Sequence, residues 1–422
     1  MMQKLIIAAA CFICILTPEL TAQKLLIPMD LRQSDHLKAY GVAYTALENK
    51  VPVEWLLNYR GGSFMIAYTE TMVNYCLARG VKTENLSAAQ VAEVYATIEN
   101  ENMEIVYLEK APHIAVYTPP DKKPWDDAVT MALEYAEIKY DKIFDLDVLQ
   151  GKLAEYDWLH LHHEDFTGQY GKFYSAYGRA AWYQQQQRDY ETFAQQMGYS
   201  KVSKEKLGVV QAMKEFIAKG GFMFAMCGAT DSFDVALAAQ KTDICDVVYD
   251  GDPVDMRANE KLDYGHCLAF QNFRVELDPY QYEFSSIDHP SSNGLRLKTP
   301  EEDYFTLFDF SAKYDPVPTM LTQNHVNVVK GFMGQTTGYR RELLKENIVV
   351  MGEDASIGSV KYLHGNFGKG TFTFYGGHDP EDYTHAVGDP PTDLALHKNS
   401  PGYRLILNNI LFPAAKKKPQ KT

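Results

Sequence analysis

Cys227 lies between a short apolar run and a helix-like run, which is where strand–turn–helix elbows hold a nucleophile. Two residues to either side, Ala225 and Ala229 are small, and Gly228 adds conformational freedom, as the strained backbone of an elbow requires. A helix beginning at the cysteine would also stabilise a thiolate and lower the pKa of Cys227. These residues predict a cysteine nucleophile. The alternative is a small apolar residue at a tight corner, with no chemical role.

A nucleophilic cysteine needs a base, and one candidate follows a later strand. The alternating run 370–375 ends in two glycines, and His378, Asp379 and Glu381 come directly after them. We expect His378 to be the base and either Glu381 or Asp379 to orient its ring. Because ligands of open α/β sheets lie beyond the carboxyl ends of the strands, Cys227 and His378 are expected to meet there.

A third polar group follows the apolar run 156–161 and ends in a glycine. It is predicted, together with Gly228, to line the oxyanion-binding and substrate-binding part of the site. No cofactor is predicted. An alternative is that His162, His163, Glu164 and Asp165 of this group bind a divalent metal. A further alternative is that the group only forms hydrogen bonds that pack the loop. The members of the group are His162, His163, Glu164, Asp165, Thr167 and Gly168.

Strands alternating with helices must position these groups. Strand-like runs lie at 24–30, 53–57, 113–117, 140–145, 156–161, 222–226 and 370–375, and helical patterns at 37–47, 128–136 and 204–219. This order predicts an α/β fold with a doubly wound, mostly parallel, flavodoxin-like sheet and an N-terminal βαβ unit. We expect an N-terminal α/β unit at 23–110, a core at 111–239 and 361–412, and an insertion of short strands and loops at 240–360.

The order of these motifs resembles the class I glutamine amidotransferase-like superfamily over about residues 111–239 and 361–385. In that family a glycine loop forms the oxyanion hole, a G-x-C-x-G elbow holds the nucleophile, and a late H-P-E supplies base and acid. The matching residues here are Thr167-Gly168, Ala225-Met226-Cys227-Gly228-Ala229 and His378-Asp379-Pro380-Glu381. Alanines replace both elbow glycines, and Asp379 separates the histidine from its proline, which leaves the orienting acid open.

Two related resemblances suggest other functions. The ending Tyr375-Gly-Gly-His-Asp379 is similar to the ThuA-like branch of the same fold, whose chemistry need not use a cysteine. Proteins that look like this one sometimes carry the name asparagine synthetase B. That enzyme needs an amino-terminal cysteine after Met removal and a Ser-Gly-Gly-x-Asp-Ser nucleotide loop, but residue 2 is Met and the chain has no such loop.

The N-terminus predicts export. A basic start at 1–4, an apolar run at 5–16 and the small pair Thr21-Ala22 form the pattern of a secretory signal peptide over residues 1–22. We therefore expect a periplasmic or secreted protein that does not span the membrane. The net charge of -14 argues against nucleic-acid binding, and the basic residues within 413–422 are expected to form a disordered tail.

The remaining cysteines do not form a scaffold. Beyond the signal peptide the chain has Cys76, Cys227, Cys245 and Cys267, too few for a disulfide framework, although Cys245 and Cys267 could pair. The sequence therefore favours a cysteine-dependent hydrolase of an amide or acyl bond with a small-molecule or glycan substrate. The alternatives are a non-catalytic binding protein for a glycan or envelope component and, third, a metal-dependent hydrolase.

Overall fold

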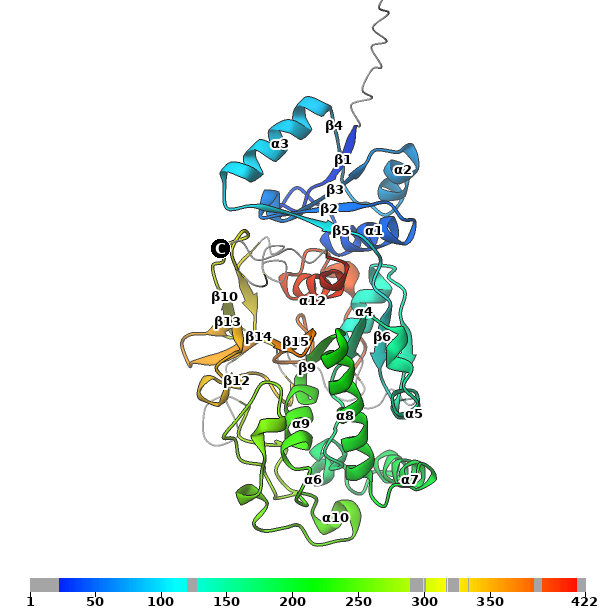
Figure 1. Ribbon diagram of the computed structural model, residues 1–422, viewed down its shortest axis with the longest axis vertical. Coiled ribbons are helices and arrows are strands. Elements are labelled where there is room, and N and C mark those ends of the chain that lie inside the picture. The colour runs from blue at the N-terminus through cyan, green and yellow to red at the C-terminus, as the bar shows by residue number, and fades with distance from the viewer. Residues whose placement is uncertain are drawn as a thin grey trace, which may run out of the picture.

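Two β-sheets organise the chain in the computed structural model (Figure 1). The structure describes residues 23–119, 127–288, 299, 301–315, 317, 326–332, 334–382 and 389–415. The predicted signal peptide lies outside these residues, as does the predicted tail from residue 416 onward. The smaller sheet lies at one end of the molecule and the larger sheet at its centre, with helix α12 (Pro401–Leu411) between them.

The smaller sheet is antiparallel throughout, with strand order β4-β1-β3-β2-β5. Helix α3 begins at a capping box, in which Ser87 and Gln90 satisfy each other's backbone N–H groups. The strands are β1 (Lys24–Ile27), β2 (Val53–Leu57), β3 (Ser63–Ala67), β4 (Glu84–Leu86) and β5 (Glu104–Leu108), and the helices are α1 (His36–Glu48), α2 (Glu70–Ala78) and α3 (Ala88–Asn100).

The prediction of an N-terminal βαβ unit is wrong. Strand β1 is not a neighbour of β2, because β3 lies between them and pairs antiparallel with both. The turn 58–62 between β2 and β3 explains this order, since a connection that short can join only antiparallel neighbours. Its backbone reverses through left-handed conformations at Asn58, Arg60, Gly61 and Gly62, and a Cβ on Gly61 would lie 2.3 Å from the Met29 carbonyl oxygen.

The larger sheet is mixed. Its parallel part has the order β7-β6-β8-β9-β15, and its antiparallel part continues from β15 through β14, β13, β10 and β11, with β12 also paired to β14. The strands are β6 (Ile114–Tyr117), β7 (Asp141–Ile143), β8 (Trp158–Leu161), β9 (Phe222–Met226), β10 (Tyr304–Leu307), β11 (Val328–Lys330), β12 (Tyr339–Arg340), β13 (Val349–Asp354), β14 (Ser359–Phe367) and β15 (Gly370–Tyr375).

The mixed sheet corrects the prediction of a doubly wound, mostly parallel, flavodoxin-like fold. The residues between 240 and 360 do not stand apart from the sheet, because their strands extend it in the antiparallel sense. The sheet changes from parallel to antiparallel pairing at β15, which pairs parallel with β9 and antiparallel with β14. A tight turn joins β14 to β15, and Gly368 in this turn has a φ of +62°. Hydrophobic patterning finds such strands but does not specify their direction.

Helices cover both faces of the parallel part. Phe222, Phe224 and Met226 of β9 belong to the core shared with α1, α4 and α12, whereas Met223 and Ala225 face the core shared with α8 and α9. Burial on both faces explains why β9 reads as a continuous apolar run. The helices are α4 (Ala128–Tyr135), α5 (Asp145–Leu149), α6 (Tyr174–Tyr177), α7 (Ala181–Gln196), α8 (Val202–Lys219), α9 (Cys227–Ala238) and α10 (Val247–Asp250).

A buried arginine joins the smaller sheet to α12. The guanidinium of Arg404 donates to the carbonyl oxygens of Met29 at 3.2 Å and Gly61 at 2.5 Å, and to the hydroxyl of Tyr40 at 3.4 Å. These contacts tie the turn of the smaller sheet to a helix that packs on the larger one. The two sheets therefore share one hydrophobic core through α1 and α12.

Candidate functional site

Cys227 occupies a strained elbow between β9 and α9. Its φ is +48°, in the left-handed region that residues other than glycine rarely adopt, and α9 begins at this residue. The backbone N–H of Ala229 donates to the carbonyl oxygen of His162 at 3.2 Å, which fixes the end of β8 beside the elbow. The strand–turn–helix arrangement expected around Cys227 is therefore present.

The sulfur of Cys227 is enclosed by backbone. Its residue is 1% exposed, and burial raises the pKa of the thiol. Hydrogen bonds from the backbone N–H groups of Thr336, Gln335 and Gly228 act in the opposite direction and lower that pKa. Burial is the larger effect, so the thiol form is favoured, while the N–H groups are placed where they would stabilise negative charge on the sulfur.

His378 lies next to the cysteine. A Cβ built on Gly334 would be 2.9 Å from the Cys227 Sγ and 3.2 Å from the His378 Cβ, so both side chains contact the same glycine. His378 itself follows Gly377, whose φ is +97° and whose Cβ would collide with Phe332. The glycine turn after β15 thus directs the histidine toward the elbow.

The two acids expected to orient the His378 ring contact other groups. Asp379 accepts hydrogen bonds from the backbone N–H of Glu381 and the hydroxyl of Thr392, both at 2.8 Å. The carboxylate of Glu381 contacts the Nδ1 of His397 at 3.1 Å and the Nζ of Lys330 at 3.7 Å. Both carboxylates are therefore engaged with partners other than His378 in the described part of the chain.

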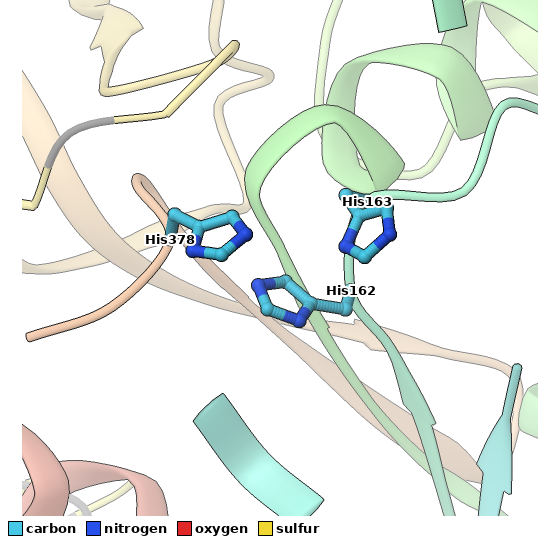
Figure 2. A group of neighbouring side chains, drawn as sticks. All are labelled: His162, His163 and His378. Atoms are coloured by element: carbon cyan, nitrogen blue, oxygen red, sulfur yellow. The ribbon is translucent and has the colours of Figure 1, made fainter. Parts of the chain in front are cut away.

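Three histidine rings meet at the carboxyl ends of β8 and β15 (Figure 2). The ring centroids of His162 and His378 are 4.4 Å apart, those of His162 and His163 are 4.8 Å apart, and those of His163 and His378 are 5.9 Å apart. One ligand nitrogen from each ring lies within 4.8 Å of the others. His162 and His378 are buried and His163 is partly buried.

The carboxylate behind these rings is Asp127. Its Oδ1 is 3.6 Å from the Nδ1 of His162, and its two oxygens lie 3.1 and 3.2 Å from the Nε2 of His160. Burial raises the pKa of Asp127, but the charges and hydrogen bonds of His160 and His162 outweigh it and hold that pKa well below its usual range. The Nδ1 of His160 contacts the carbonyl oxygen of Phe224 at 3.1 Å.

Sequence reasoning missed Asp127, although a signal was available. Asp127 is the N-cap of α4, where its carboxylate accepts from the backbone N–H groups of Val129 and Thr130. An aspartate directly before a helical run is a standard helix-start signal. Since α4 follows β6, a parallel neighbour of β8, its first residues reach the same edge of the sheet as His162.

The other predicted residues after β8 mainly shape their own loop. Asp165 accepts from the backbone N–H and hydroxyl of Thr167, both at 2.6 Å, and from the N–H of Gly171 at 3.0 Å. Gly168 has a φ of +82° and packs against Ser203, where a Cβ would lie 2.7 Å from the Ser203 nitrogen. Thr167 and Gly168 are thus used to fold the loop against α8.

Two of the backbone N–H groups at the Cys227 sulfur were not predicted from the sequence. Of the predicted donors, Gly228 contacts the sulfur of Cys227, and the N–H groups of Gln335 and Thr336 join it there. Glu164 accepts from the backbone N–H of His162 at 2.7 Å, and burial followed by the charge of Asp127 raises the pKa of Glu164 to about 7. No local sequence pattern identifies Gln335 or Thr336, because they come from the segment between 240 and 360.

A hollow of about 510 Å³ of empty space, open to solvent, adjoins the histidine cluster. His163 and Glu164 lie on its wall. Lys206, also on the wall, is paired with Asp145 through an Nζ–Oδ2 contact of 2.6 Å. Four aromatic side chains also line the hollow: Phe144, Tyr170, Phe173 and Tyr190.

Cys245 and Cys267 do not form the disulfide that the sequence left open. Both are buried free thiols, as is Cys76. Each donates to a carbonyl oxygen, Cys245 to Thr167 at 3.4 Å and Cys267 to Asp234 at 3.3 Å. These thiols stabilise loop packing around α9.

Comparisons with known proteins add little to this geometry. No family model matches the chain, and no curated protein matches it. Among solved structures, two cytoplasmic proteins of Salmonella typhimurium, STM3548 and STM1381 (strain LT2), are each 10% identical. Their TM-scores are 0.33 and 0.36, and the matches cover 75% and 72% of this chain and 91% and 100% of theirs.

A β-galactosidase from Bacillus circulans sp. alkalophilus is also similar, at 11% identity and a TM-score of 0.27. That match covers 65% of this chain and 29% of the other. TM-scores this low support no inference about fold or function. Among the described residues, no helix combines the length and apolar character needed to cross a bilayer.

Proposed function

We propose that this protein is a cysteine-dependent hydrolase of an amide or related acyl bond, with Cys227 as the nucleophile and His378 as the base. The observation that carries the proposal is the geometry of Cys227. Its left-handed backbone places the sulfur against backbone N–H groups and against Gly334, which also contacts the His378 side chain. Strained non-glycine residues and convergent N–H donors are both concentrated at functional sites. The order of the glycine loop, elbow and histidine motifs, which resembles that of class I glutamine amidotransferases, supports the same assignment.

The proposed reaction has two halves. His378 takes the thiol proton as the sulfur of Cys227 bonds to the substrate carbonyl carbon, and backbone N–H groups at Gly228 and Gln335 stabilise the oxyanion. Collapse of this intermediate breaks the carbon–nitrogen bond, and His378 returns the proton to the departing amine. Water then attacks the thioester, which releases the acid and restores the thiol.

In this proposal His162 and Asp127 replace the acid that was expected beside His378. The His162 ring lies between the His378 ring and the Asp127 carboxylate, at a centroid distance of 4.4 Å and an Nδ1–Oδ1 distance of 3.6 Å. A positive charge that develops on His378 is then stabilised by the carboxylate through one intervening ring. Asp379 and Glu381 hold the loop that carries His378.

Substrate access requires movement of the segment 334–336. This segment covers the sulfur, and Cys227 is 1% exposed. That burial favours the alternative of a non-catalytic binding protein, whose ligand would occupy the aromatic hollow beside His163. A glycan or envelope component is the ligand class for this alternative, because sugar rings stack on aromatic side chains, and export over residues 1–22 would place the protein among such ligands.

Thiol reactivity separates the two functions. The protein is treated with iodoacetamide at neutral pH, and alkylation of each cysteine is followed by peptide mass spectrometry. We expect Cys227 to react faster than buried Cys76, whose pKa burial raises to about 11, and His378→Ala to slow Cys227. His113→Ala, at an exposed histidine, is the control and should leave the rate unchanged.

Turnover is tested with p-nitrophenyl acetate as an activated acyl substrate. We expect a burst of nitrophenol from the wild-type protein and none from Cys227→Ser, which changes the side-chain volume little and should keep the fold. Circular dichroism and thermal unfolding check that fold. If Cys227 alkylates no faster than Cys76 and no burst is seen, the hydrolase proposal is wrong and the binding-protein alternative replaces it.

A further inference from the structure

We infer that His162, His163 and His378 form a binding site for a zinc-class divalent ion. One ligand nitrogen from each ring lies within 4.8 Å of the others, and the rings converge from the end of β8 and from the loop after β15 (Figure 2). In a tetrahedral zinc site, metal–nitrogen bonds of about 2.0–2.1 Å place the ligand nitrogens roughly 3.4 Å apart. Small side-chain rotations are therefore enough to reach that geometry.

The surroundings supply the outer shell that such a site needs. Histidine ligands usually direct their second ring nitrogen to a carboxylate, which fixes the ring and raises its basicity. Asp127 is placed to do this for His162, since its Oδ1 lies 3.6 Å from the Nδ1 and a small rotation of the ring would close a hydrogen bond. The carboxylate also offsets part of the charge of the ion in a region where His162 and His378 are buried.

The site also has an open side. His163 lies on the wall of the hollow, so a water molecule or a ligand group can reach the fourth coordination position from there. The residues that would bind the metal differ from those expected from the sequence. Glu164 and Asp165, expected as ligands, are held by backbone N–H groups of their own loop, and His378 from the distant strand replaces them.

Metal binding and thiol catalysis would compete for one residue. A nitrogen of His378 that binds the ion is no longer free to take the Cys227 proton, so the ion would inhibit the proposed hydrolase. This consequence rests on the proposed function, whereas the metal site itself does not. Ion binding is therefore measured directly, without reference to turnover.

The experiment uses the mature chain after dialysis against EDTA and then against metal-free buffer. Zn²⁺ is titrated calorimetrically, and Co²⁺ is titrated while its visible absorption reports tetrahedral coordination. We expect about one equivalent of each ion to bind, with intense Co²⁺ bands. Loss of an outer-shell partner typically weakens metal binding roughly 10–100-fold. His163→Ala removes a ligand and should therefore weaken Zn²⁺ binding by at least that factor. Asp127→Asn removes only an outer-shell charge and should weaken Zn²⁺ binding roughly 10-fold.

Two controls make the result specific. Cys227→Ala should bind Zn²⁺ as the wild type does, because the sulfur is not a ligand, and His113→Ala should have no effect because it removes an exposed histidine. Circular dichroism confirms that each variant is folded. Unchanged binding in the double variant His162→Ala plus His163→Ala, or no binding of either ion by the wild type, overturns the metal site. Zn²⁺ binding with an inert Cys227 would instead overturn only the hydrolase.

Discussion

Cys227 and His378 meet across Gly334, where a Cβ would lie 2.9 Å from the sulfur of one and 3.2 Å from the Cβ of the other. The contact joins three segments that are far apart in sequence: the elbow after β9, the loop after β15 and the segment before β12. Glycine is required here because any side chain would displace one of the two functional groups. Gly334 therefore covers the thiol and lies in contact with the base of the His378 side chain.

The first prediction concerns Gly334→Ala. The new methyl group must displace the segment 334–336 or the Cys227 side chain, which should lower the free energy of unfolding by about 1–3 kcal/mol. It should also increase the rate of Cys227 alkylation, because the cover over the sulfur is loosened. Gly265→Ala is the control, since a Cβ there would meet only the exposed Asp263 carboxylate, at 3.2 Å. Unchanged stability together with an unchanged alkylation rate would contradict this account.

The elbow at Cys227 and the position of His378 after its strand could be predicted because their signals are local. An apolar strand, small residues around Cys227 and a following helix are contiguous, and His378 directly follows its own strand. The carboxylate that lies next to His162 could not be predicted in the same way. Asp127 reaches His162 only because β6 and β8 are parallel neighbours, and the donors Gln335 and Thr336 reach the sulfur only through the fold of a long insertion.

The fold shows the same division between local and long-range information. Each of the seven strand-like runs contains a strand, and β2, β9 and β15 match the prediction residue for residue, whereas β3 to β5 and β10 to β14 were not predicted individually. The predicted parallel direction is wrong in the smaller sheet, because alternation of apolar residues is the same in parallel and antiparallel strands. The short strands expected between 240 and 360 had no predicted direction, and they extend the larger sheet in the antiparallel sense. The short glycine turn at 58–62 was the available signal for a hairpin.

The second prediction concerns Asp127. Asparagine can still cap α4, so Asp127→Asn should keep the helix but remove the negative charge between His160 and His162. We expect a loss of about 1–3 kcal/mol of stability from the weakened contacts to these buried rings. Asp127→Ala should cost about 1 kcal/mol more, because the cap is lost as well. Urea denaturation of the two variants measures both effects, and equal stability of wild type and Asp127→Asn would show that the charge has no role.

The third prediction tests export. If residues 1–22 are a signal peptide, amino-terminal sequencing of protein from the native host should begin at or near Gln23, in the periplasmic or secreted fraction. Ile7→Asp, which interrupts the apolar run, should retain Met1 and stay in the cytoplasm. An intact Met1 in wild-type protein would refute export, and a lipid on Cys14 would make the protein membrane-anchored.

The fourth prediction concerns Asp231, which lies one turn after Cys227 on α9. Its carboxylate is buried, receives a hydrogen bond from the Ser285 hydroxyl at 2.8 Å, and faces the acids Asp288, Asp234 and Glu283. Burial, together with the charge of Asp288, raises the pKa of Asp231 to about 8 despite the Ser285 contact. The pKa of Asp288 is raised by burial to about 7. Both groups therefore bind protons more tightly in the folded protein than in the unfolded chain.

The sign of the pH dependence follows from this difference. In the unfolded chain Asp231 loses its proton near its ordinary pKa of about 3.9. Between that pH and about 8 the folded state holds one more proton at this site, so the free energy of unfolding falls as pH rises. The contribution is fully present below about pH 4 and is lost as pH rises through 8. One proton corresponds to a slope of about 1.4 kcal/mol per pH unit.

Asp231→Asn isolates this slope. The amide keeps the size of the side chain and can still bond to Ser285, but it does not titrate. Urea denaturation at pH 5, 6, 7 and 8 should show a decline in stability for the wild type that is shallower in the variant by up to about 1.4 kcal/mol per pH unit. Asp189→Asn on the exposed face of α7 is the control and should keep the wild-type slope. Parallel stability curves for wild type and Asp231→Asn would mean that Asp231 is already ionised in the folded protein.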